Sequence, residues 1–199
     1  NSFLSCISDI LSCDKNNKKM GLFKIKSILI DKLNEDIFRS IYAGNLPNIF
    51  NNPIEKLSSL DNFKNYLLND KIEITHKYLW DFLQRKNILF EDGINIFIFE
   101  NNTLLCPKGE NINGFYDINK KSILIIKFKN YYEPIYYLEG NGKTSIKKCI
   151  FNNENEEIHK LFEISLKNCK SNPEHDIDWI SVLKDNIKKY DLDIDNITI

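Results

Sequence analysis

Several features that would point to a function are scarce or missing in this chain of 199 residues. Neither sign of charge is in excess, because 27 lysines and arginines face 28 aspartates and glutamates, for a formal net charge of -1. Nucleic-acid-binding domains carry a clearly basic face or stripe, so this balance argues against a nucleic-acid partner. No apolar run approaches the roughly 20 residues that span a bilayer, and we expect no membrane partner.

Alanine, glycine and arginine are also scarce, whereas asparagine, isoleucine and lysine are over-used. This bias is typical of an AT-rich genome. The asparagines are scattered between apolar segments and form no long run, so they do not indicate a disordered tract. The length is sufficient for one domain with a core of considerable size.

The cysteines lack the spacing of a metal site or of a disulfide framework. They are odd in number: Cys6, Cys13, Cys106, Cys149 and Cys169. No pair has the CxxC spacing of a zinc or redox motif. We therefore expect no zinc site and no disulfide framework, and we predict a reducing compartment. Nothing else in the sequence indicates a cofactor.

Apolar residues at helical spacing predict four helices in the first 90 residues. Asn1 or Ser2 can cap the first, Pro53 suits the first turn of the third, and Thr75 can cap the fourth. The apolar stripes are, in chain order, Phe3, Ile7, Ile10 and Leu11; Ile25, Ile28, Leu29 and Leu33, continued by Ile37 and Ile41; Ile54, Leu57, Leu60 and Leu67; and Tyr78, Leu79, Phe82 and Leu83, with Trp80 flanking.

The period of the pattern changes in the stretch around which the chain is organised, residues 93–138. Runs of β-branched and aromatic residues predict strands here. The predicted strands cover residues 94–99, 103–106, 122–128 and 133–138. Lys129 and Asn130 form a tight link before the last strand, and Pro134 lies near its start, where a missing N–H is tolerated.

Helical patterns return over residues 154–169 and 177–190. The order of elements predicts an α+β fold, in which N-terminal and C-terminal helices pack on a small, mainly antiparallel sheet. We expect one domain over residues 1–170 and a C-terminal helical extension over residues 171–199.

The histidines and the acidic residues do not form a recognisable metal site. The histidines are His76, His159 and His175. No two of them have the i, i+4 spacing of helical metal ligands, and we expect each to be a solvated surface residue. Glu174, Asp176 and Asp178 lack the glycine and the closing glutamate of a calcium loop. They are better explained as acids near a helix start.

Two other motifs are incomplete. Residues 140–144 read GNGKT but lack the first glycine of a phosphate-binding loop, so they predict a turn. A metal-dependent nuclease needs an acid followed by an acid-x-Lys pair on neighbouring strands. The strand over residues 122–128 has lysines but no carboxylate, and Glu100 is alone.

An aromatic cluster surrounds the link between the last two predicted strands. Its members are Phe128, Tyr131, Tyr132, Tyr136 and Tyr137. Aromatic residues on a sheet can stack on bases. They more often fill a core, and without net basic charge we interpret the cluster as packing.

Two stretches are similar to parts of one enzyme family. Residues 1–7 (NSFLSCI) resemble the start of the nucleophile helix, and residues 123–135 (ILIIKFKNYYEPI) resemble the histidine strand and its turn, in the ovarian-tumour (OTU) class of papain-like cysteine proteases. That family has the same order of elements. Residues 78–98 also resemble stretches of large proteins from nucleocytoplasmic large DNA viruses. That source implies the host cytoplasm or the virion.

Both catalytic positions of the OTU family differ in this chain, where Ser2 stands at the nucleophile position and Tyr131 at the histidine position. A cysteine protease needs a thiolate activated by a neighbouring imidazole. Serine is far less acidic, and tyrosine, with an ordinary pKa near 10, is no base at neutral pH. Cys6, one helical turn beyond Ser2, could be a displaced nucleophile, but we favour a core role.

The resemblance therefore implies a catalytically inactive OTU-like module that serves as a binding or scaffold domain of a larger viral protein. Its cleft beside Ser2, Asn130, Tyr131 and Tyr132 would hold a ubiquitin-like tail, another extended peptide or another viral protein. One alternative is an active, deubiquitinase-like hydrolase that pairs Cys6 with a histidine. Another is a nucleic-acid-associated module of a viral replication or transcription protein. The OTU-like arrangement requires the start of the Ser2 helix to face the turn at residues 128–132.

Overall fold

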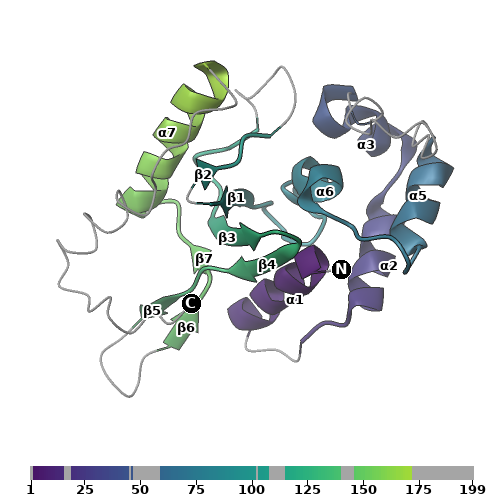
Figure 1. Ribbon diagram of the computed structural model, residues 1–199, viewed down its shortest axis with the longest axis horizontal. Coiled ribbons are helices and arrows are strands. Elements are labelled where there is room, and N and C mark those ends of the chain that lie inside the picture. The colour runs from purple at the N-terminus through teal and green to yellow at the C-terminus, as the bar shows by residue number, and fades with distance from the viewer. Residues whose placement is uncertain are drawn as a thin grey trace.

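The computed structural model describes residues 2–15, 19–44, 46, 59–101, 103–107, 115–139 and 146–171 (Figure 1). Its helices are α1 (Ser2–Lys15), α2 (Leu22–Lys32), α3 (Glu35–Ser40), the 3-10 helix η1 (Ile41–Gly44), α5 (Leu60–Leu68), α6 (His76–Leu83) and α7 (Glu156–Ser171). Its strands are β1 (Asn95–Glu100), β2 (Thr103–Leu104), β3 (Ser122–Phe128), β4 (Tyr131–Pro134), β5 (Tyr137–Glu139), β6 (Ile146–Lys148) and β7 (Ile150–Phe151). The predicted α+β class is confirmed.

Some predicted elements lie outside the described residues. They are the helix start at Pro53, the turn over residues 140–144 and the C-terminal extension beyond residue 171. Among the helices that the structure does describe, none combines the length and the apolar content that crossing a membrane requires.

The main sheet is mixed, with strand order β2-β1-β3-β4 and β7 as a second partner of β3. Its longest pair, β1 with β3, is parallel and runs from Asn95 opposite Ser122 to Glu100 opposite Lys127. The other pairs are antiparallel, so the prediction of a mainly antiparallel sheet missed the direction of its central pair. A parallel pair needs a connection of a dozen or more residues, and residues 101–121 provide one.

The two faces of this sheet are buried against different helices, because neighbouring residues of a strand point to opposite faces. Ile96 and Ile98 of β1 belong to one core together with side chains of α1, α2, α5 and α6. Phe97 and Phe99 belong to a second core with Ile158 and other residues of α7. Figure 1 accordingly shows α7 on one side of the sheet and the remaining helices on the other.

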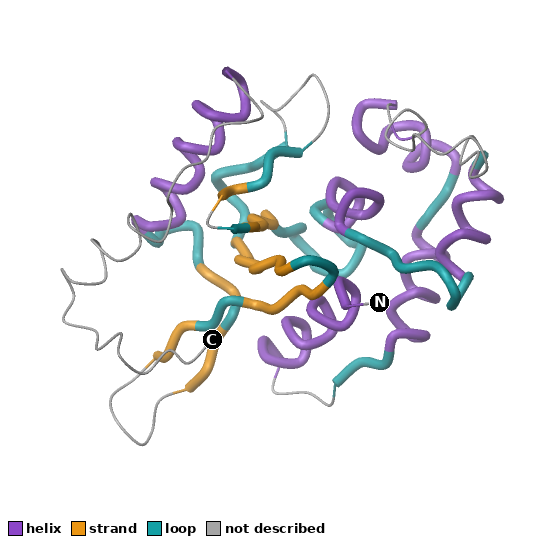
Figure 2. Tube along the Cα trace, in the orientation of Figure 1, coloured by secondary structure: helices purple, strands orange, loops and turns teal. Residues whose placement is uncertain are grey.

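The predicted strand over residues 133–138 is wrong, because the chain forms two shorter strands there. After β4 ends at Pro134, the N–H of Ile135 still bonds to the carbonyl oxygen of Leu124 at 2.8 Å. The chain then leaves the main sheet, and β5 pairs with β6 in a separate antiparallel hairpin (Figure 2). The turn of the chain at residues 135–136 therefore divides one apolar run between two sheets.

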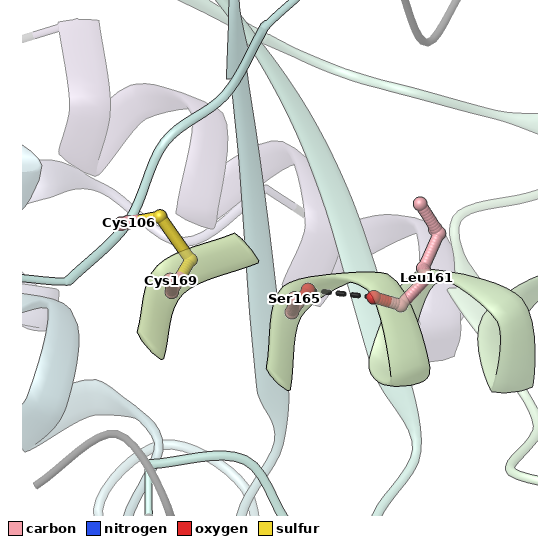
Figure 3. The surroundings of a disulfide bond; sticks show 4 residues. All are labelled: Cys106, Leu161, Ser165 and Cys169. Carbon is pink, nitrogen blue, oxygen red and sulfur yellow. Dashed lines mark hydrogen bonds between the residues drawn. A yellow bond between two sulfur atoms is a disulfide. The ribbon is translucent and has the colours of Figure 1, made fainter. Parts of the chain in front are cut away.

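A disulfide joins Cys106, two residues after β2, to Cys169 in the last turn of α7 (Figure 3). The prediction that the cysteines form no disulfide is wrong for this pair. The two residues are separated by 63 positions, and their Cα atoms lie 5.4 Å apart. A pairing of this kind depends on the fold, so no local spacing could indicate it. Cys6 and Cys149 are buried free thiols, and Cys13 is partly exposed.

Candidate functional site

The start of α1 lies against β4, the edge strand of the main sheet. The Ser2 hydroxyl oxygen accepts a hydrogen bond from the backbone N–H of Tyr132 at 2.9 Å. Phe3, the next residue of α1, packs its ring 5.1 Å from the Tyr132 ring, centroid to centroid. The start of the Ser2 helix therefore lies against the turn at residues 128–132.

The bond to Ser2 also closes an exposed strand edge. In an antiparallel pair, alternate residues of the edge strand direct their N–H groups away from the partner. Tyr132 and Pro134 hold these outward positions in β4, since Ile135 donates inward to β3. Ser2 accepts the Tyr132 N–H and Pro134 has none, so β4 offers no free donor for a further strand at these two positions.

Tyr131 and Asn130 lie beside this contact and are exposed. Tyr131 pairs with Phe128 across the hairpin, and the two side chains are 68% and 61% exposed. Lys129 forms the turn with a positive φ of 53° and places its ammonium 5.5 Å from the centre of the Phe128 ring. The predicted packing role is therefore wrong for Phe128 and Tyr131, although it is correct for Tyr132, which is buried.

The structure thus brings together Ser2 and Tyr132 and leaves Tyr131 and Asn130 on the adjoining surface. Within the described part of the chain, the Ser2 hydroxyl makes its one hydrogen bond as an acceptor from a backbone N–H. A nucleophilic hydroxyl instead needs a base that takes its proton. No such base contacts Ser2 among the described residues.

His76 is buried, and the prediction of a surface histidine is wrong at this position. The side chain is 5% exposed, and its Nδ1 atom lies 2.8 Å from the Tyr132 hydroxyl oxygen. The ring also makes an edge contact with Trp80, at 5.4 Å between centroids. Burial, together with the smaller effect of the positive charges of Lys127 and Lys77, lowers the pKa of His76 to about 3. The imidazole is therefore neutral at physiological pH.

The helical pattern contained a signal for this burial. His76 and Trp80 are four residues apart and so share one face of α6. The predicted stripe of Tyr78, Leu79, Phe82 and Leu83, with Trp80 flanking, is correct for Leu79, Phe82 and Leu83, but the structure also buries Trp80 almost completely. His159, in contrast, is exposed as predicted, with Nε2 2.6 Å from the Asn153 carbonyl oxygen. His175 lies outside the described residues.

Cys6 is a core residue, as predicted. Its side chain is 1% exposed. Burial raises the pKa of the thiol far above its ordinary value, and the negative charges of Glu133 and Asp9 raise it further. No imidazole is hydrogen-bonded to Cys6 in the described ranges, so the geometry supplies neither a thiolate nor its activating base.

A cleft of about 370 Å³ lies next to these residues. Its walls are the first turn of α6 (residues 75–78), Trp80, Tyr42 of η1, and the ends of β1 and β3. His76 and Tyr132 line it as well. Glu100, which the sequence analysis described as alone, pairs with Lys127, its neighbour across the parallel strands. Its carboxylate therefore has a cation as its partner and no second acid.

The described residues contain no group of three or more histidines, cysteines, aspartates or glutamates that could hold a metal ion. The chain matches no protein-family model, no curated protein and no solved structure.

Proposed function

We propose that this chain is a non-catalytic recognition or scaffold domain with an OTU-like arrangement. One observation carries the proposal, the 2.9 Å hydrogen bond between the Ser2 hydroxyl and the Tyr132 N–H. This bond supports the packing of a helix start against a strand. In an OTU protease, the helix start would hold the nucleophile and the strand would hold the base. In this chain the two positions carry Ser2 and Tyr131, which cannot form a thiolate–imidazole pair.

The same contact supports a role in binding. The Ser2 hydroxyl stabilises the edge of the sheet, and the neighbouring cleft is walled by side chains that are themselves held by hydrogen bonds. Such a rigid surface loses little conformational freedom when a partner binds. The partner in this proposal is an extended peptide segment, from a ubiquitin-like protein or from another viral protein, and the domain belongs to a larger viral protein.

The proposed arrangement can be tested by restoring the missing pair. We suggest Ser2→Cys with Tyr131→His in a Cys13→Ser background, which removes the other partly exposed free thiol. A thiol has an ordinary pKa of about 8.5, and an adjacent imidazolium lowers it. The rate of alkylation by iodoacetamide, measured against pH, should give a thiol pKa at least about one unit lower than in Ser2→Cys alone.

Ser2→Cys with Glu133→His is the matched control, because Glu133 lies two residues further along β4, roughly 7 Å away. If both histidine variants lower the thiol pKa equally, or if neither does, the OTU-like arrangement is wrong. The unmodified chain should form no adduct with a ubiquitin probe that carries a C-terminal electrophile. An adduct at any cysteine would show that the domain is catalytically competent.

A further inference from the structure

The cleft between the start of α6 and the sheet has the size of a ligand site. Its volume of about 370 Å³ falls within the range of roughly 300–1,000 Å³ that small-molecule pockets occupy. It combines aromatic walls with a few polar groups, which is the usual composition of such pockets. Several of these polar groups belong to the first turn of α6.

The first turn of a helix has backbone N–H groups without intrahelical partners, and these form the positive end of the helix dipole. In α6 the N-cap residue, Thr75, makes no side-chain capping bond. Its hydroxyl oxygen is buried and has no hydrogen-bond partner within the part of the chain that the structure describes. Residues 75–78 all line the cleft, so this uncapped helix start is directed at it.

A buried imidazole forms part of the same wall. His76 is 5% exposed, and its Nδ1 atom is hydrogen-bonded to the Tyr132 hydroxyl. The second ring nitrogen, Nε2, makes no hydrogen bond to any described residue. A nearly buried polar group that faces a cleft without a partner is what a ligand with a complementary group would satisfy.

The charges around the cleft favour an anion. Lys77 and Lys127 both line it, and Glu100, the carboxylate among the lining residues, is paired with Lys127. Burial is the largest cause of the lowered pKa of His76, and the positive charges of both lysines lower this pKa as well. An oxyanion at the start of α6 would therefore meet the helix dipole and the Lys77 ammonium together.

The aromatic walls of the cleft are held rigidly. The Tyr42 hydroxyl donates to the Lys77 carbonyl oxygen at 2.8 Å, and the Tyr42 N–H donates to Asp81 Oδ2 at 2.9 Å. These bonds hold Tyr42 at a positive φ of 51°, which is rare for a residue with a side chain. The Trp80 indole is fixed by its bond to the Ile96 carbonyl oxygen at 2.8 Å. Strained, well-supported residues of this kind cluster at binding sites.

We propose that this cleft binds a ligand in which a carboxylate or phosphate group is joined to an aromatic or apolar body. The oxyanion lies at the first turn of α6 beside Lys77, and the body packs against the aromatic side chains of Tyr42, Tyr78 and Trp80 that line the cleft. This proposal rests on the recognition function proposed above and specifies the chemistry of what is recognised.

The test uses the full chain and four probes: phenyl phosphate, benzoate, benzyl alcohol and inorganic phosphate. Each is titrated while the backbone amide resonances of His76, Lys77 and Tyr78 are followed by nuclear magnetic resonance. We expect saturable shifts with phenyl phosphate or benzoate, and the tighter of the two identifies phosphate or carboxylate as the preferred group. Benzyl alcohol should not saturate, because it lacks the charge, and inorganic phosphate should bind more weakly, because it lacks the body.

Lys77→Gln should raise the dissociation constant of the anionic probes about five-fold, the effect of one partly solvated charge. Lys71→Gln is the matched control, since Lys71 is an exposed lysine that precedes α6 and does not line the cleft. Equal binding of benzyl alcohol, equal effects of the two substitutions, or no saturable shift with either anionic aromatic probe would each overturn the proposal. Equal binding of inorganic phosphate and phenyl phosphate would overturn the role of the aromatic walls. The thiol titration at Ser2 and Tyr131 does not involve Lys77, so either proposal can fail alone.

Discussion

The face of the sheet that carries Ile96 and Ile98 is covered by several helices, which are held there by packing and by hydrogen bonds such as those of Ser2 with Tyr132 and of Trp80 with Ile96. The face that carries Phe97 and Phe99 is covered by α7, whose last turn a disulfide ties to the loop after β2. Many elements share the burial of the first face, whereas one helix provides much of it on the second. A disulfide compensates for the limited apolar burial when one helix packs on a sheet without neighbouring helices.

The two faces also differ in the polar groups that they bury. The first face contains His76, Tyr132 and the Ser2 contact, and the cleft opens beside them. The core of the second face consists of apolar and aromatic side chains, such as Phe97 stacked on Tyr116 at 4.6 Å between centroids. Buried polar groups are costly unless they are paired. On the first face His76 and Tyr132 pair with each other beside the cleft, whereas the second face buries the Tyr116 hydroxyl without a hydrogen-bond partner among the described residues.

The largest effect should come from removing the disulfide on the α7 face. In Cys106→Ser with Cys169→Ser, we expect the free energy of unfolding to fall by about 2–4 kcal/mol, because the cross-link closes a long loop in the unfolded chain. Urea unfolding measures the loss. Amide exchange should accelerate more in α7 than in α1, and equal acceleration in both helices would contradict the difference between the two faces. Cys13→Ser, which removes a free thiol, is the control.

Local patterns in the sequence predicted the elements well where their limits are themselves local. The strand over residues 122–128 was correct to the residue, because an apolar β-branched run ends at the turn of Lys129 and Asn130. The first helix was correct for the same kind of reason, with a polar start and a regular apolar stripe. The contact between the Ser2 helix start and the turn was expected from the resemblance, and local periodicity alone would not have indicated it.

The features that sequence reasoning missed depend on which elements become neighbours. The parallel pairing of β1 with β3 brings together positions that are far apart in the sequence, and so does the disulfide between Cys106 and Cys169. The burial of His76 depends on how much of a short helix its neighbours cover, and α6 buries His76 and Trp80 in addition to the predicted Leu79, Phe82 and Leu83. The cleft combines residues from η1, α6, β1 and β3, so it exists only once those elements have packed.

The second largest effect should be a pH dependence of the free energy of unfolding that arises from His76, on the face of the sheet that carries Ile96 and Ile98. Folding lowers the pKa of His76 from 6.5 to about 3. Between these two pH values, the unfolded chain therefore binds a proton at His76 that the folded chain does not bind. Stability from the neutral ring is complete above pH 6.5 and is lost as the pH falls toward 3. Between pH 6 and pH 5 the loss should be about 1 kcal/mol.

Urea unfolding of the unmodified chain and of His76→Gln at both values of pH measures this loss, since the variant has no such proton to exclude. His159→Gln is the matched control, because His159 is exposed and its removal should leave the pH dependence unchanged. A pH dependence that survives in His76→Gln would show that other groups cause it.

The smallest effect should come from Ser2→Ala, which removes the acceptor for the Tyr132 N–H at the sheet edge. One hydrogen bond of this kind contributes about 0.5–1.5 kcal/mol. Exchange of the Tyr132 amide, followed by nuclear magnetic resonance, should accelerate, whereas Ser5→Ala on the same helix should leave it unchanged. Cys169→Ser with Cys106→Ser should accelerate it less than Ser2→Ala does, because Cys106 lines the cleft with Tyr132 but the disulfide does not accept the Tyr132 N–H. Exchange of the Tyr132 amide that accelerates in the disulfide variant and not in Ser2→Ala would show that the edge of β4 is held from the α7 side. The contact with α1 would then be a consequence of the fold and no part of a binding site.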